Sequence, residues 1–386
     1  MSKELIEFIQ DLYNTKDLIP LHEPLFDQRD KENLIRTIES TFVSSIGPMV
    51  EEFESKICKY TDSNFAIAVM NGTAALHIAM LLSNVKANDE VITQSFNFVA
   101  SVNAIHQSNA VPVFVDIDLD NLGMCPNSLL NFLETNCEIR DDGFCWNRTS
   151  NRIIKACMPM HTFGLPCDLD KLKKICKQFN LSLIEDAAES LGSFYKSRHT
   201  GTIGDVGVLS FNGNKIITTG GGGIVLTNDS EKAALAKHIT TTAKLDKKWF
   251  FEHDRIAYNY RMPNINASLG VSQVEKLPRL LKAKRVIAKK YLEYSKSLNL
   301  RFVSEPRYAK SNYWLNTFIT EDIKQRNEIL ELTNQAKVMT RAAWNPMHML
   351  DFNKTYQTSS LENTEWLFER VINVPSSVKG TLYEKV

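Results

Sequence analysis

The sequence predicts an α/β protein with a large, mostly parallel sheet that is covered by helices on both faces, followed by a smaller α+β domain. Two observations lead to this prediction. Between about residues 45 and 230, short apolar runs rich in β-branched residues alternate with stretches of helical length, as in parallel sheets with crossover helices. The chain has 386 residues, of which 43% are hydrophobic, enough for a large core and a second, smaller one.

The elements follow from these runs. Strands of the large sheet are expected at residues 65–70, 90–93, 111–117, 153–160, 181–185, 206–211 and 223–227, with helices between many of them, such as 73–82 and 169–179. Further on we expect a long helix at 267–297, a strand at 314–320, a helix at 323–335 and a strand at 338–344. These elements divide the chain into an N-terminal helical arm (1–45), a large domain (46–262), and a connecting helix with a small α+β domain (263–386). The arm is expected to pack on the rest of the chain or on a partner subunit.

The composition excludes several classes of function. Lysine plus arginine and aspartate plus glutamate both number 45, and no long basic block occurs, so nucleic acid and anionic membrane surfaces are poor candidates as partners. No apolar run approaches the roughly 20 residues of a membrane span, and the N-terminus lacks the apolar core of a signal peptide. The seven cysteines are scattered without a CxxC pair. We therefore expect a cytoplasmic protein with free thiols and no cysteine metal site.

One lysine and one acid carry the main chemical prediction. The expected strand 206–211 leads into a polar turn that holds Lys215, and four glycines follow at 220–223. The expected strand 181–185 ends at Asp186. Taken alone, the lysine could be a solvated surface residue and the aspartate a helix cap, but apolar strands and glycines surround the lysine. A lysine that forms a Schiff base and a carboxylate that holds a proton on a pyridine nitrogen are the requirements of a pyridoxal 5'-phosphate (PLP) enzyme.

Two further segments could hold such a cofactor. Gly72 and Thr73 open a helix directly after a strand, where free backbone N–H groups can bind a phosphate. Phe96 and Phe98 follow the next strand, and one of them could stack on a flat ring while the other is buried. The alternatives are an ordinary helix start and two core phenylalanines.

Three histidines and a second acid are also candidates. Glu189 lies three residues after Asp186 and could face the same ligand. His161, at the end of an expected strand, is a candidate substrate-binding residue, and so are His22 and His348. For each histidine the alternative is a hydrogen-bonded side chain that only orders its own turn, and for His22 and His348 we favour that alternative.

Five segments together resemble the DegT-type family of nucleotide-sugar aminotransferases, which are PLP enzymes of fold type I. These segments are residues 71–76, 96–101, 185–192, 204–215 and 258–262, and the resemblance covers nearly the whole chain. It implies that Lys215 is the Schiff-base lysine and that Asp186 pairs with the pyridine nitrogen.

The same resemblance implies the remaining cofactor contacts. Phe98 and Ala188 would lie against the two faces of the ring. Gly72, Thr73 and Ser210 would hold the phosphate, and Asn259 would reach it from the neighbouring subunit of a homodimer. Glu189 stands where many members have glutamine near the cofactor hydroxyl.

Within the family, residues 211–219, 20–24 and 344–348 resemble 4-aminotransferases of the legionaminic acid and bacillosamine pathways. The resemblance implies that glutamate donates an amino group, held on the cofactor as pyridoxamine phosphate, to UDP-4-keto-6-deoxy-N-acetylglucosamine. A GDP-linked 4-keto-6-deoxy sugar is the alternative acceptor. Three other readings remain: a cofactor-dependent sugar dehydratase, a non-catalytic regulator, and an enzyme acting on amino acids alone. Dehydratase relatives carry a histidine where this chain has Lys215, which disfavours the first reading. The presence of both Lys215 and Asp186 disfavours the second, and the match at residues 258–261 disfavours the third.

Overall fold

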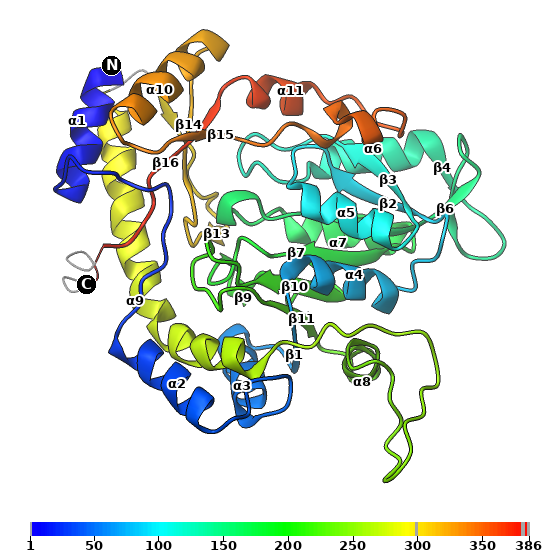
Figure 1. The fold of residues 1–386 in the computed structure, drawn as a ribbon. Coiled ribbons are helices and arrows are strands. Elements are labelled where there is room, and N and C mark those ends of the chain that lie inside the picture. Colours follow the sequence, from blue (N-terminus) through cyan, green and yellow to red (C-terminus); the bar gives the residue numbers. More distant parts are fainter. Residues whose placement is uncertain (1, 298–299, 380–382, 384–386) are drawn as a thin grey trace.

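The computed structural model describes residues 2–297, 300–379 and 383, so that residues 1, 298–299, 380–382 and 384–386 of the predicted domains lie outside it. A large α/β body is joined by one long helix to a smaller, mainly antiparallel sheet (Figure 1). The predicted fold class is confirmed. The boundaries at residues 45 and 262 stay predictions.

The large sheet contains all seven predicted strands. In spatial order they are β1 (Phe65–Val69), β11 (Gly223–Thr227), β10 (Val206–Ser210), β7 (Ser182–Asp186), β6 (Arg152–Met158), β2 (Glu90–Gln94) and β3 (Val111–Val115). The strands from β10 to β3 are parallel to one another, whereas β11 runs antiparallel to both of its neighbours. The carboxyl ends of the parallel strands therefore meet at one edge, where ligands bind in sheets of this kind.

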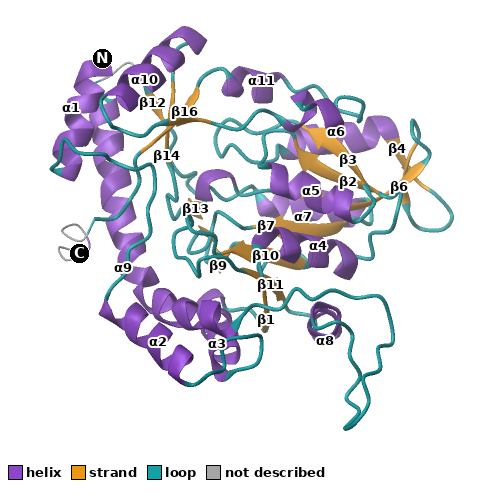
Figure 2. Ribbon diagram, viewed as in Figure 1, coloured by secondary structure: helices purple, strands orange, loops and turns teal. Residues whose placement is uncertain are grey.

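Helices cover both faces of this sheet, as the orange strands between purple helices in Figure 2 show. On one face lie α4 (Gly72–Leu82), α5 (Val99–Gln107) and α8 (Ser230–Thr240), and on the other α6 (Pro126–Asn136) and α7 (Leu169–Gln178). Adjacent residues of one strand also belong to the apolar clusters on opposite faces of the sheet. Ile184 belongs to the first apolar cluster and Leu183 to the second, because neighbouring side chains of a strand point to opposite faces.

Several shorter elements complete the chain. A hairpin of β4 (Cys137–Ile139) and β5 (Cys145–Asn147), which the sequence did not predict, extends the large sheet beside β6. A separate three-stranded sheet contains β13 (Ala309–Lys310), β8 (Phe194–Tyr195) and β9 (Arg198–His199). Helix α3 (Pro48–Thr61), helix α11 (Glu362–Phe368) and the short 3-10 helices Thr162–Gly164, Met347–Met349 and Asp351–Asn353 are the remaining pieces.

The smaller unit is built on α9 (Asn264–Ser295). Its sheet has the order β12 (Arg301–Phe302), β14 (Asn316–Ile319), β16 (Val371–Val374) and β15 (Arg341–Ala342), with α10 (Ile323–Gln335) packed against it. The N-terminal helices α1 (Ser2–Tyr13) and α2 (Gln28–Glu39) pack on α10 and α9 of the same chain. None of the helices in the described ranges is long and apolar enough to cross a membrane.

A buried lysine links the long helix α9 to the small sheet through hydrogen bonds. Lys284 of α9 is 1% exposed, and its Nζ donates to the carbonyl oxygens of Trp314 at 3.1 Å and Ser376 at 2.6 Å. No carboxylate of the described chain forms an ion pair with it. Burial lowers the pKa of Lys284 to about 7, because the ammonium loses its hydration inside the protein.

This lysine makes stability depend on pH in a defined direction. Between about pH 7 and the ordinary lysine pKa of about 10.4, the unfolded chain binds the proton more strongly than the folded one, so the free energy of unfolding rises with pH. Lys284→Met removes that contribution, which amounts to at most about 1.4 kcal/mol per pH unit.

Urea unfolding at pH 7.5, 8.5 and 9.5 measures the slope. We expect a smaller rise of stability with pH in Lys284→Met than in the wild type. Lys290→Met, on an exposed position of the same helix, is the matched control and keeps the wild-type slope. Equal slopes in both variants would show that Lys284 does not titrate in this range.

Candidate active site

A cavity of about 470 Å³ opens at the carboxyl ends of β7 and β10. The cavity wall contains eight of the nine residues that the sequence assigned to catalysis or the cofactor: Gly72, Thr73, Phe98, Asp186, Ala188, Glu189, Ser210 and Lys215. The N-terminal arm and the small sheet supply other parts of the wall, through residues such as His22 and Arg341. Residues far apart in the sequence therefore meet around one space.

Lys215 projects into this cavity from the turn after β10. Its backbone N–H donates to the Asn212 carbonyl at 2.9 Å, which closes the turn. Its Nζ lies 3.3 Å from Glu189 Oε1 and 4.1 Å from the centre of the Trp314 ring. The side chain is 11% exposed, so the amine is held in a protected position that a ligand in the cavity can reach.

Asp186 is a buried carboxylate at the end of β7. The Ser101 hydroxyl donates to Oδ2 at 2.6 Å and the Ala188 N–H donates to Oδ1 at 3.1 Å. Burial raises the pKa of this carboxyl above its usual value, although both hydrogen bonds and the charge of Lys215 act in the opposite direction. A buried carboxylate beside a cavity is stabilised by a cationic group, and a protonated pyridine nitrogen is such a group.

Glu189 supplies a second acid to the same wall. Its Oε2 accepts from the Phe163 N–H at 2.9 Å, and its Oε1 faces the Lys215 amine. Burial raises the pKa of Glu189, and the nearby charge of Asp186 adds to this, while Lys215 lowers it. The two acids and one amine therefore form a compact charged group.

The start of α4 forms a cradle beside Ser210, in which an anion could lie. A Cβ added at Gly72 would lie 3.0 Å from the Cβ of Ser210, so the glycine keeps this space open. The Asn71 side chain caps the helix by accepting from the Ala74 N–H at 2.8 Å. Backbone N–H groups at the helix start and the hydroxyls of Thr73 and Ser210 can hold an anion here.

The structure separates the two phenylalanines. Phe96 is fully buried, whereas Phe98 is 43% exposed and lines the cavity. The Phe98 ring lies 5.7 Å from that of Trp344. Phe98 is therefore the residue placed to stack on a planar ligand, and Phe96 belongs to the core.

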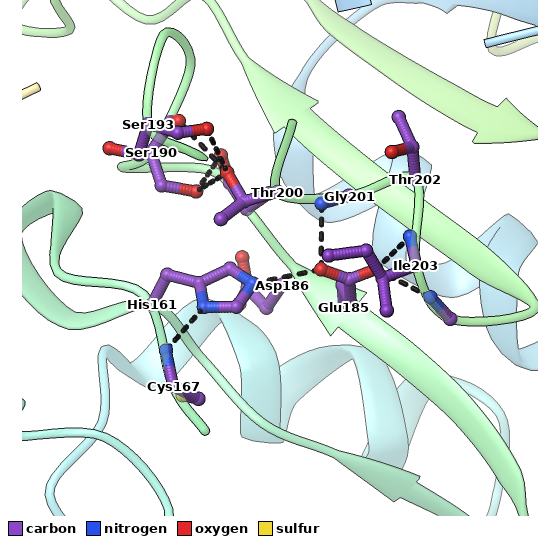
Figure 3. A network of polar contacts seen from close by, with 12 residues as sticks. His161, Cys167, Glu185, Asp186, Ser190, Ser193, Thr200, Gly201, Thr202 and Ile203 are labelled. Atoms are coloured by element: carbon purple, nitrogen blue, oxygen red, sulfur yellow. Dashed lines mark hydrogen bonds and ion pairs between the residues drawn. The ribbon is translucent and has the colours of Figure 1, made fainter. Parts of the chain in front are cut away.

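His161 does not line the cavity, and its geometry fits the structural alternative. Its ring is completely buried; Nε2 lies 3.1 Å from Glu185 Oε2, and Nδ1 accepts from the Cys167 N–H at 3.1 Å. Glu185 also accepts from the backbone N–H groups of Gly201 at 2.7 Å and Ile203 at 2.6 Å (Figure 3). These hydrogen bonds and His161 lower the pKa of Glu185 despite its burial. The His161–Glu185 pair thus holds the loop of residues 201–203 next to the end of β7.

The other three residues lie in different surroundings. His348 Nδ1 is 2.7 Å from the Ser95 hydroxyl, outside the cavity. His22 lines the cavity; burial lowers its pKa, and its Nδ1 has no hydrogen-bond partner among the described residues. Asn259 is exposed, accepts from Arg261 Nε at 3.1 Å and does not line the cavity.

The wall also contains residues that were not predicted as site residues, and Arg341, Trp314 and Trp344 are among them. Arg341 of β15 and Lys215 are the lysine and arginine residues that line the cavity in the described chain, and no described carboxylate pairs with Arg341. All three come from the small sheet and its loops. Their local sequence carries no signal, because only the packing of that sheet against the large one brings them here.

Comparison with known proteins agrees with this geometry. The model of the DegT/DnrJ/EryC1/StrS aminotransferase family matches residues 24–384. The chain belongs to this family. It is a PLP-dependent sugar aminotransferase, and the buried Asp186, the open cradle at Gly72 and the Lys215 amine fit that cofactor.

Individual relatives cover nearly the whole chain. GDP-perosamine synthase of Escherichia coli O157:H7 is 34% identical over 360 residues, 93% of each chain. The aminotransferase TlmJ from Streptoalloteichus hindustanus has a similar crystal structure, with a TM-score of 0.85, 25% identity and 96% of each chain covered. The crystal structure of DesI in the presence of its TDP-sugar product gives a TM-score of 0.81 at 25% identity, covering 93% of this chain and 88% of DesI.

Proposed function

We propose that this enzyme transfers the amino group of glutamate to C4 of a nucleotide-linked 4-keto-6-deoxy sugar. The observation that carries the proposal is the meeting of Lys215 and Asp186 in one cavity with Arg341, a cation from the small sheet that has no carboxylate partner in the described chain. The names of two relatives, a GDP-perosamine synthase and a protein solved with a TDP-sugar product, support a nucleotide sugar as acceptor.

The residues of the chain would divide the work as follows. PLP, when bound, supplies a conjugated ring that takes up the electron pair left when a carbon loses its proton. Asp186 would hold the proton on the ring nitrogen. Lys215 Nζ, once the amino donor has displaced it, would take the proton from the donor's α-carbon and return it at the cofactor carbon. With the keto sugar, the Lys215 amine would move the proton in the reverse direction. Glu189 would hold that amine in place.

Two acceptors are to be compared. The sequence resemblance to the legionaminic acid branch supports UDP-4-keto-6-deoxy-N-acetylglucosamine, and the relatives named GDP-perosamine synthase support a GDP-linked 4-keto-6-deoxy hexose. Both share the diphosphate and the C4 carbonyl, so the same proton transfers serve either one. Only the contacts to the base and to C2 of the sugar differ.

The testing experiment follows the visible absorption of the PLP-loaded enzyme together with the sugar product by mass spectrometry. We expect glutamate to abolish the visible band and one of the two keto sugars to restore it with formation of a 4-amino sugar. Lys215→Ala should bind PLP without a covalent bond and lose turnover by about 10³-fold or more, because no other amine among the described residues lines the cavity. Full activity of this variant would refute the mechanism, and a band that glutamate leaves unchanged would refute the donor.

Arg341 is placed to bind the α-carboxylate of glutamate. A guanidinium holds a carboxylate through two parallel hydrogen bonds, and this arginine has no carboxylate partner in the described chain. We expect Arg341→Gln to raise KM for glutamate by about 10- to 100-fold, with a smaller change in kcat.

Steady-state kinetics with each substrate varied in turn checks this role. Arg307→Gln, at an exposed position outside the cavity, serves as the control and should leave both KM values unchanged. If KM rises for the nucleotide sugar alone, Arg341 binds the diphosphate and the carboxylate contact lies elsewhere.

The proposal includes a homodimer with shared active sites. The segment between α8 and α9 projects from the body (Figure 1) and carries Trp249, Phe250, Phe251 and Ile256, which are 77%, 66%, 83% and 92% exposed. Large apolar side chains on a projecting segment are usually covered by another molecule. Asn259 lies on the same segment, and a second copy of the chain would bring it to the partner's phosphate cradle.

Mixed dimers test this arrangement. Asn259→Ala should weaken PLP binding, and Lys215→Ala should be inactive. When the two variants are co-expressed, random pairing gives mixed dimers in which one site has both native residues, so about a quarter of all sites should regain wild-type affinity and turnover. Absence of any gain over the sum of the separate variants would place both residues of a site on one chain.

A further inference from the structure

Trp314 contacts the backbone that carries the candidate Schiff-base lysine. It is 4% exposed and lies in the segment that leads into β14, and its Nε1–H donates to the Asn214 carbonyl oxygen at 2.7 Å. That carbonyl belongs to the peptide bond between Asn214 and Lys215. Since a peptide group is planar, a hydrogen bond to its oxygen fixes the orientation of the unit from which the Lys215 side chain extends.

The same indole also contacts the far end of this lysine. The Lys215 Nζ lies 4.1 Å from the centre of the Trp314 ring, within the range of a cation–π interaction. One side chain thus holds Lys215 both at its backbone and at its amine. The ring face is attractive to the positively charged form of the nitrogen and offers nothing comparable to the neutral form.

The backbone of Trp314 is itself fixed by two hydrogen bonds. Its backbone N–H donates to Asn312 Oδ1 at 2.8 Å, and its carbonyl accepts from the buried Lys284. Asn312 Nδ2 in turn donates to the Glu189 carbonyl at 2.9 Å. Because Glu189 faces Lys215 Nζ, the contacts form a closed circuit from the lysine through the tryptophan and the asparagine to the acid and back.

We propose that Trp314 is a positioning residue that holds the Lys215 amine at the cavity, through its hydrogen bond to the Asn214 carbonyl and through the face of its ring. This inference rests on the proposed role of Lys215 as the Schiff-base lysine. It assigns the small sheet a part in proton transfer, because Trp314 reaches the lysine from that side of the cavity. No atom of Trp314 takes part in the reaction.

Two variants separate the N–H group from the ring face. Trp314→Phe keeps an aromatic face and loses the hydrogen bond to the Asn214 carbonyl, and Trp314→Leu loses both. We expect Trp314→Phe to slow the reaction with glutamate in single turnovers by about tenfold, with KM nearly unchanged. Trp314→Leu should be slower still, and the pH midpoint of the visible band of the lysine-bound cofactor should fall by about half a unit, because the cation loses the ring.

The control is Trp366→Phe on α11, a tryptophan outside the cavity, which should match the wild type in rate and midpoint. Wild-type rates and midpoints in both Trp314 variants would overturn the proposal, and so would a change confined to KM, which would make Trp314 a substrate contact. If Trp314→Leu does not fold, as judged by circular dichroism, the rate of Trp314→Phe decides.

The titration of the visible band needs no substrate, so it tests the role of Trp314 separately from the proposed function. If the wild type shows the band but does not react with glutamate or either keto sugar, the proposed function fails while the role of Trp314 is still decided by the midpoint of Trp314→Leu. If the PLP-loaded wild type shows no band, Lys215 does not bind the cofactor covalently and both proposals fall.

Discussion

The arrangement of the site depends on two adjacent acids at the end of β7. Glu185 and Asp186 are both buried and, as neighbours in a strand, point to opposite sides. The hydrogen-bonding capacity of Glu185 is taken up inside the protein by His161 and by the backbone N–H groups of Gly201, Ile203 and Gly204. Asp186 keeps one side toward the cavity. One acid therefore fixes the loop that leads into β10, and through β10 the turn of Lys215, while the other is left available for a ligand.

Electrostatics explains why this cavity suits a cationic ring. Among the described residues of the cavity, the acids Asp186 and Glu189 share one amine, that of Lys215, and burial raises the pKa of both carboxyls. A protonated pyridine nitrogen beside Asp186 would supply the missing positive charge, so the protein would favour the form of the cofactor that withdraws electrons best. Lys215 is also the residue that separates this chain from the rival dehydratase reading, since a histidine at that position could not form the covalent bond.

Much of this could be predicted from the sequence because the signals were local. The seven strands of the large sheet each form a continuous apolar run, and Lys215, Asp186 and Gly72 stand at the ends of such runs. The short strands β12 and β16 were missed because two to four residues give no measurable alternation. The choice between Phe96 and Phe98, and the inward position of Arg341, depend on packing between segments hundreds of residues apart. No pattern within a window of the sequence carries that information.

The wide spacing of the cavity wall also determines when the site can exist. Its residues run from Pro20 to Asn373, and Ser376 and Ser377 hold Lys284 and the backbone of Glu23 through hydrogen bonds. During synthesis, the large sheet can form once β11 has left the ribosome, but the wall remains open until the segment from Asn373 to Ser377 has emerged as well. A nascent chain therefore has a folded body well before it has a binding site, and PLP can bind only to chains that have been synthesised beyond Ser377.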